Sequence, residues 1–83
     1  MTPAVLLENL GAEIRARRLA LDMTQEGLAF EAHVHPNLVG RIERGEDNPT
    51  VLTLNALTEV LGCTLGDLFI AAERRAYGSP PIG

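Results

Sequence analysis

Asn37 and Arg41 carry side chains of the kinds that distinguish DNA bases. An asparagine amide can form two hydrogen bonds with adenine, and an arginine guanidinium can form two with guanine. The two residues stand one helical turn apart, so a helix that contained both would present them on one face. Either could instead be an ordinary solvated polar residue, and the interpretation therefore depends on the element that carries them.

Residues suited to catalysis or metal binding are few. His33 and His35 stand two apart with no cluster of cysteines or carboxylates beside them, and Cys63 is the single cysteine. No catalytic triad, zinc-binding set or phosphate-binding loop is visible. One cysteine also excludes an internal disulfide, so packing must hold the fold. We therefore expect a protein that is not an enzyme and that needs neither a metal nor a cofactor.

The chain has 83 residues, of which 46% are apolar, which suits one small folded domain and excludes a disordered segment. No apolar run approaches the roughly 18 residues that cross a bilayer. The N-terminal segment lacks a basic leading region, and Glu8 and Asn9 interrupt its apolar stretch, which argues against a secretory signal. We expect a cytoplasmic protein that does not bind a membrane.

Two short helices around a three-residue turn are the strongest pattern in the chain. The first begins after a Thr24 cap and spans 25–32, and the second runs from residue 36 to about residue 44. These proportions fit a helix-turn-helix, in which small residues allow two helices to cross closely. The small or compact residues at the predicted crossing are Ala29, Val39 and Gly40. His33 falls where the turn needs a left-handed backbone, a conformation that histidine tolerates better than β-branched residues.

Three further helices are predicted around this pair, which makes five. The first begins at Thr2 and Pro3, a cap and a first-turn proline. Its predicted buried stripe comprises Leu7, Leu10, Ile14 and Leu21. The fourth follows a Thr50 cap and ends at Gly62, and the fifth begins with a capping box formed by Thr64 and Asp67. Residues 77–83, rich in glycine and proline, are predicted to be a disordered tail.

Four segments, in order, carry a resemblance to a known family. They are IRARR (14–18), MTQEGLA (23–29), VGRIERGEDNPT (39–50) and LGCTLGDLF (61–69). With these segments the chain resembles the Cro/repressor-like, or XRE-type, helix-turn-helix regulators. The resemblance implies an all-α fold, a compact five-helix lambda-repressor-like DNA-binding domain over residues 10–70, with the helix-turn-helix motif at 25–44. Within the family, the short chain is similar to restriction-modification controllers and small phage regulators.

The resemblance also implies roles for individual residues. The third helix would enter the major groove as the recognition helix. Its predicted base-reading residues are His35, Pro36, Asn37, Leu38 and Arg41. The predicted phosphate contacts are Gln25, Arg44 and Asn48. Other roles stay open: Leu38 could belong to the core, Gln25 could simply favour a helix start, and Arg44 and Asn48 could serve only as a helix-end charge and a turn former.

Arg18 continues the apolar stripe of the first helix, where a buried charge needs a partner. The family suggests an ion pair with Glu43, which would tie the first helix to the third. This pairing would also remove a carboxylate that repels phosphate from the DNA-reading helix. We interpret Arg18 and Glu43 as structural residues.

The chain is acidic, with 11 acidic and 7 basic residues and a net charge of -4. Once Glu43 is paired, we expect Arg41 and Arg44 to remain uncancelled on a weakly basic face. Glu46 and Asp47 border this face, so few phosphates would be neutralised and the salt dependence of DNA binding would be shallow.

The family resemblance predicts a homodimer on double-stranded DNA. Residues of the fourth and fifth helices would form the two-fold interface. The predicted interface residues are Leu52, Leu65, Phe69 and Ile70, although the same residues could be the core of a monomer. We therefore expect a sequence-specific transcriptional regulator that binds a near-palindromic operator, with autoregulation as one role. The alternative is an antitoxin-like or adaptor module that binds a protein partner, with weak DNA binding, and the acidic charge favours this alternative.

Overall fold

The computed structural model describes residues 1–78, which form five α-helices and no strand. The helices are α1 (Pro3–Ala20), α2 (Gln25–Ala32), α3 (Pro36–Glu43), α4 (Val51–Leu61) and α5 (Leu65–Tyr77). The predicted all-α, five-helix fold is thereby confirmed. Tyr77 is the last residue of α5 and Gly78 is its C-cap, so the predicted tail begins inside this helix. The rest of that tail, 79–83, lies outside the described residues.

Threonine side chains begin four of these helices, as the sequence predicts. In each, the hydroxyl oxygen accepts a hydrogen bond from a backbone N–H three residues on, at 2.9 to 3.2 Å. The four residues are Thr2, Thr24, Thr50 and Thr64. At α5 the bonding is reciprocal, because the backbone N–H of Thr64 also donates to Asp67 Oδ2 at 3.0 Å. Hydrogen bonds from Thr64 to its carboxylate lower the pKa of Asp67.

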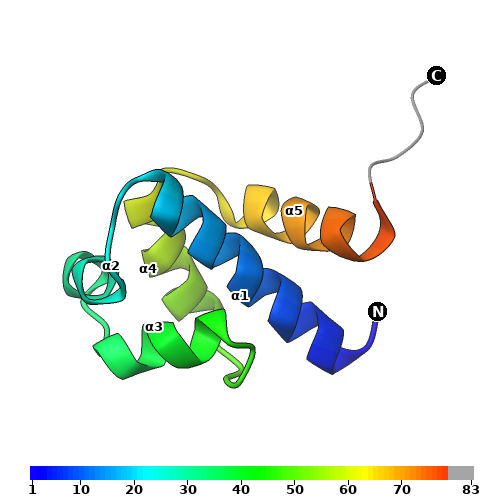
Figure 1. Cartoon of the computed structure of the whole chain (residues 1–83), viewed down its shortest axis with the longest axis horizontal. Coiled ribbons are helices and arrows are strands. Elements are labelled where there is room, and N and C mark those ends of the chain that lie inside the picture. Colours follow the sequence, from blue (N-terminus) through cyan, green and yellow to red (C-terminus); the bar gives the residue numbers. More distant parts are fainter. Residues whose placement is uncertain (79–83) are drawn as a thin grey trace.

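Helix α1 runs across the molecule with α5 on one side and α2, α3 and α4 on the other (Figure 1). It packs mainly against α5 and α3, while α2 packs against α3 and α4. Apolar side chains from all five helices of the described chain meet between them. The buried apolar residues are Leu10, Ile14, Leu28, Ala29, Ala32, Val39, Ile42, Leu54, Leu57, Leu61, Leu68 and Ala72. This single core holds α2 and α3 at a fixed crossing.

The buried stripe of α1 differs from the predicted one at both ends. At the N-terminal end Leu7 is only half-buried, and Leu6 packs against the core. Leu21 is 51% exposed, because α1 ends at Ala20 and the chain turns away at Leu21, the C-cap. The buried position one turn after Ile14 belongs to Arg18 instead. A charged group therefore completes the face of α1 that packs against α3.

Gly11 marks a close approach of α1 to α3. A Cβ atom added at Gly11 would collide with the backbone carbonyl oxygen of Ile42, and it would lie 2.7 Å from that of Glu43. Because backbone atoms cannot swing away as a flexible side-chain end can, only glycine fits here without moving a helix. Gly11 therefore sets the spacing between α1 and the end of α3.

Within residues 1–78, each helix alone is too short or too polar to span a bilayer. Helices α4 and α5 reach the required length and apolarity only as a pair, and the pair is bent by 96°.

Candidate nucleic-acid interface

The left-handed residue in the turn is His33, with φ 59° and ψ 40°, as the sequence predicts. The turn brings α2 and α3 together, and the Val34 N–H donates to the Ala29 carbonyl oxygen at 3.0 Å across it. Ala29, Val39 and Gly40 are buried where the two helices meet. Helices α2 and α3 therefore form the helix-turn-helix that the sequence predicts.

An open hollow of about 320 Å³ lies between these two helices. It is lined by Gln25, Glu26, Pro36, Asn37, Gly40, Arg41 and Arg44. Five of these seven residues are among the predicted DNA contacts, so the fold gathers them on one surface. Gly40 helps keep the hollow open, because a Cβ at this position would lie 3.1 Å from Arg44 Nη1 and 3.4 Å from Gln25 Oε1.

The predicted base-reading residues differ in how far they are exposed. His35, Pro36, Asn37 and Arg41 are exposed, whereas Leu38 is half-buried and packs against the core. Leu38 therefore contributes to the core and remains partly exposed, and its contact with a thymine methyl group stays a prediction.

His35 has a structural role at the start of α3. Its Nδ1 accepts a hydrogen bond from the backbone N–H of Asn37 at 3.1 Å, which makes His35 the N-cap. An accepting Nδ1 places the proton of the neutral ring on Nε2. The nitrogen that His35 can offer to a ligand is therefore the donor Nε2, and the sequence pattern does not reveal this restriction.

Arg18 and Glu43 form a two-bond ion pair in the interior. Arg18 Nε lies 2.7 Å from Glu43 Oε2, and Arg18 Nη2 lies 2.9 Å from Oε1. The side chains are only 8% and 2% exposed. Arg18 Nη1 also donates to the Met23 carbonyl oxygen at 2.8 Å. The hydrogen bond from its guanidinium to Glu43 raises the pKa of Arg18, so the guanidinium stays protonated.

Gln25 joins this pair from α2. Its Nε2 donates to Glu43 Oε1 at 3.0 Å, so the cluster links α1, α2 and α3. One of the two amide protons of Gln25 is thus already bonded inside the protein. Any contact of Gln25 with a phosphate must use the other proton. Glu43 is the predicted partner of Arg18, but the hydrogen bond between Gln25 and Glu43 was not predicted from the sequence.

The expectation that Arg41 and Arg44 are uncancelled is wrong. Arg41 Nε lies 3.1 Å from Asp47 Oδ2, and Arg44 Nε lies 3.0 Å from Glu46 Oε2. The chain folds back after α3 at Gly45, where φ is 73°. The acidic loop therefore contacts the arginines directly, although the sequence suggests only that it borders them.

The backbone holds this loop against α3. The Gly45 N–H donates to the Ile42 carbonyl oxygen at 3.0 Å, and the Glu46 N–H donates to the Arg41 carbonyl oxygen at 2.9 Å. Asn48, further along the loop, is exposed. Glycine after a helix is the signal from which this return could have been anticipated.

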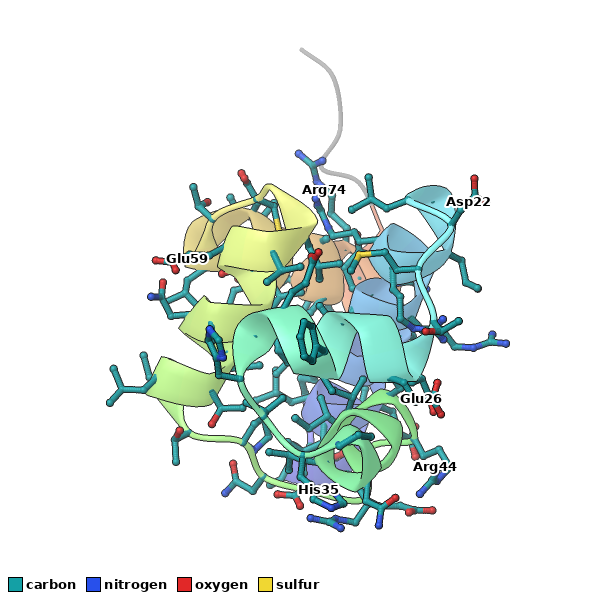
Figure 2. All side chains as sticks on the ribbon, turned by 90° about the vertical axis from the view of Figure 1, so that its left-hand side faces the viewer. Asp22, Glu26, His35, Arg44, Glu59 and Arg74 are labelled. Carbon is teal, nitrogen blue, oxygen red and sulfur yellow. The ribbon has the colours of Figure 1, made fainter. Side chains whose placement is uncertain are left out.

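Figure 2 shows at which ends of the molecule four of its labelled side chains lie. His35 and Arg44 lie at one end, whereas Glu59 and Arg74 lie toward the other. The hollow between α2 and α3 is therefore on a surface distinct from that of Glu59 and Arg74.

The four predicted dimer residues divide into two pairs. Leu52 and Ile70 are 81% and 51% exposed, whereas Leu65 and Phe69 are half-buried and pack against the core. Leu65 and Phe69 therefore contribute to the core of the monomer and remain partly exposed, and their place in a dimer interface stays a prediction. Val51, next to Leu52, is also exposed and was not predicted.

The residues that could support catalysis or metal binding stay apart. Among residues 1–78, no group of three or more histidine, cysteine, aspartate or glutamate side chains could hold a metal ion. Burial raises the pKa of the Cys63 thiol, which disfavours the reactive thiolate.

Comparison with known proteins places this geometry among gene regulators. A family model described as helix-turn-helix matches residues 14–68. The structure of ClgR, the clp gene regulator of Corynebacterium glutamicum, is similar with a TM-score of 0.78 and 31% identity, over 82% of this chain and 87% of that one. The restriction-modification controller protein C.AhdI of Aeromonas hydrophila is similar with a TM-score of 0.74 and 32% identity, over 76% of this chain and 96% of that one.

A second restriction-modification controller protein, wild-type C.Esp1396I, gives a TM-score of 0.78 and 26% identity, over 87% of this chain and 95% of that one. A search of curated proteins returned no match.

Proposed function

The chain belongs to the XRE-type helix-turn-helix family of DNA-binding transcriptional regulators, and from that premise we propose that it binds a near-palindromic operator sequence-specifically as a homodimer. The observation that carries this proposal is the pair of exposed side chains on α3. Asn37 and Arg41 stand one turn apart beside the hollow between α2 and α3. A helix laid in the major groove would bring both to base edges, with Asn37 suited to adenine and Arg41 to guanine.

Backbone contacts would fix the position of α3 in the groove. Gln25 lies in the first turn of α2, where its free amide proton and the backbone N–H groups of the helix start can bind one phosphate. Arg44 at the end of α3 and Asn48 in the loop would contact the same strand further along. These contacts set the orientation, and the base contacts select the sequence.

The proposed two-fold interface comprises the exposed Leu52 and Ile70, the half-buried Leu65 and Phe69, and the exposed Val51 beside Leu52. Pairing would bury these residues, and the dimer would make twice as many DNA contacts as a single subunit. The two recognition helices would then lie about 34 Å apart, one turn of DNA. The monomer–dimer equilibrium would set the fraction of protein that can bind the operator. The concentration of the protein would then control its activity, which suits autoregulation in the cytoplasm.

The first experiment is fluorescence anisotropy with DNA from upstream of the gene and with scrambled DNA, each at two salt concentrations. We expect the upstream DNA to be preferred at both. If the protein does not bind the upstream DNA, binding sites are selected from a pool of random DNA sequences. Binding to no selected sequence would overturn the proposal.

Arg41→Ala tests the recognition helix directly. Loss of a two-bond base contact should weaken specific binding by about 1–3 kcal/mol, or about fivefold to 150-fold, without unfolding the protein. Arg74→Ala is the matched control, because it removes the same charge on α5, away from the hollow (Figure 2). Equal losses in the two variants would show that only net charge matters.

A protein-binding module is the second candidate, and the ion pairs of Arg41 and Arg44 favour it because they reduce the positive charge of the DNA-facing surface. Such a module would bind upstream and selected DNA only weakly, and it would form a complex with a protein partner in solution.

A further inference from the structure

The two exposed arginines of the proposed DNA surface are both engaged by carboxylates of one short loop. Asp47 pairs with Arg41, and Glu46 pairs with Arg44. We call these two contacts the loop pairs. Each loop pair uses a single hydrogen bond from the arginine Nε, whereas the interior Arg18 makes two bonds with its partner.

We propose that Glu46 and Asp47 compete with DNA for Arg44 and Arg41, so that these two carboxylates set the affinity and the salt dependence of the interface. This inference rests on the proposed DNA-binding function. It assigns to the loop a role beyond that of a neighbouring acidic surface, because the carboxylates occupy the same guanidinium groups that DNA would need.

Because the loop pairs are exposed to solvent, they are weak enough for DNA binding to break them. The side chains of Arg41 and Asp47 are 47% and 28% exposed, and those of Arg44 and Glu46 are 56% and 55% exposed. Water and salt screen such pairs, and each typically changes an equilibrium constant by only about 1.4-fold to fivefold. The loop pairs therefore lower the affinity without abolishing binding.

The two arginines are affected differently. Arg41 is the proposed base-reading residue and its partner is the less exposed carboxylate, so Asp47 should affect binding to the operator more than binding to scrambled DNA. Arg44 is a proposed backbone contact, so Glu46 should affect both DNAs alike.

The start of the loop stays beside α3 when the arginines turn to DNA. Backbone hydrogen bonds from Gly45 to Ile42 and from Glu46 to Arg41 hold the loop against the end of α3. The acidic groups then remain close to the phosphates and repel them. Competition for arginine and repulsion of phosphate act in the same direction, and the experiment must separate them.

Asp47→Asn and Glu46→Gln remove each carboxylate while keeping the size of the side chain. We expect each to tighten DNA binding by about twofold to fivefold at about 50 mM salt and by less at about 200 mM salt. The slope of log K against log salt should become steeper, because a DNA-facing surface with one carboxylate fewer is more positive and releases more counterions from DNA. Glu59→Gln makes the same charge change away from the site and should leave the affinity unchanged (Figure 2).

A double-mutant cycle identifies the mechanism. In the Arg41→Ala background, Asp47→Asn should give a clearly smaller gain than in the parent, because no guanidinium is left to be released. A full gain in that background would overturn competition for Arg41 and leave only phosphate repulsion. Glu46→Gln in the Arg44→Ala background tests the second pair in the same way.

The outcomes also separate this inference from the function on which it rests. In one outcome the parent binds its operator, and Asp47→Asn and Glu46→Gln are correctly folded by circular dichroism but bind with unchanged affinity. This outcome would overturn the proposed competition and leave the DNA-binding function in place. Failure of the parent and of both variants to bind upstream or selected DNA would overturn the function and this inference together.

Discussion

The interior pair between Arg18 and Glu43 gives the sharpest stability prediction. Arg18→Ala removes two short bonds and leaves the Glu43 carboxylate, which is 2% exposed, with only the Gln25 amide as a partner. Leaving one member of a buried pair without its counter-charge costs about 3–5 kcal/mol. This is a large part of the 5–15 kcal/mol by which a typical domain is stable.

The expected shift can be converted to a melting temperature. In a domain of this size, each 1 kcal/mol lowers the melting temperature by about 4–8 °C, so Arg18→Ala should melt at least about 12 °C below the parent. Urea unfolding followed by circular dichroism gives the free energy directly. Several protein concentrations are needed, because subunit pairing would make stability depend on concentration.

Arg17→Ala is the matched control on the same helix. Arg17 pairs with Glu13 at 3.0 Å, four residues away, and the Arg17 side chain is 32% exposed. Loss of this pair should cost less than about 1 kcal/mol. An Arg18→Ala protein within about 1 kcal/mol of the parent would refute the reasoning.

The double variant Arg18→Met with Glu43→Leu tests the cause. If the cost of Arg18→Ala comes from a stranded charge, replacing both members with apolar residues should recover most of the stability. Stability as low as that of Arg18→Ala would point instead to lost packing or to the lost bond with Met23.

Three further predictions concern other regions. Gly11→Ala should lower the unfolding free energy by about 1–3 kcal/mol, because the added methyl group meets backbone of α3, and an equal or raised melting temperature would contradict this despite the gain in helix propensity. Asp67→Asn should lower the melting temperature at neutral pH. The lowered pKa of Asp67 means that its carboxylate stabilises the fold fully at pH values above the usual aspartate pKa of about 3.9. This stabilisation is lost as the pH falls through the lower pKa of the folded state, so the melting temperatures of parent and variant should converge in acid. An equal difference in melting temperature at neutral and acid pH would oppose the capping explanation. Leu52→Glu should shift the protein toward monomer in sedimentation experiments while leaving its melting temperature nearly unchanged at low concentration, and a dimer of undiminished stability would place the interface elsewhere.

Helix starts were readable because they depend on neighbouring residues. The threonine caps at Thr24 and Thr50, the capping box at Thr64 and the left-handed His33 each need only a few adjacent residues, and the structure has all of them. The family segments likewise identify a helix-turn-helix, and the family model matches 14–68. The assignment of individual residues to bases and phosphates stays a prediction.

Contacts across the fold were harder to anticipate. Arg18 could be paired with Glu43 only through the family resemblance, since 25 positions separate them. The close approach at Gly11 left no signal in the local pattern. Helical periodicity indicates which side of a helix a residue lies on, but it does not indicate how deeply neighbouring helices bury that side.

The sequence by itself determined the five helices, their caps and the position of the helix-turn-helix, because hydrogen bonds and apolar spacing within a few residues decide these features. The tertiary structure alone decided that Gln25 of α2 is anchored to Glu43 of α3 and that α1 approaches the backbone of α3 at Gly11. The pairing of Asp47 and Glu46 with Arg41 and Arg44, and the use of Nδ1 by His35 to cap α3, are contacts between near neighbours whose atoms the residue types alone did not specify. The physical reason is that the strength and the availability of a charged or polar group depend on which atoms the folded chain brings within about 3 Å of it.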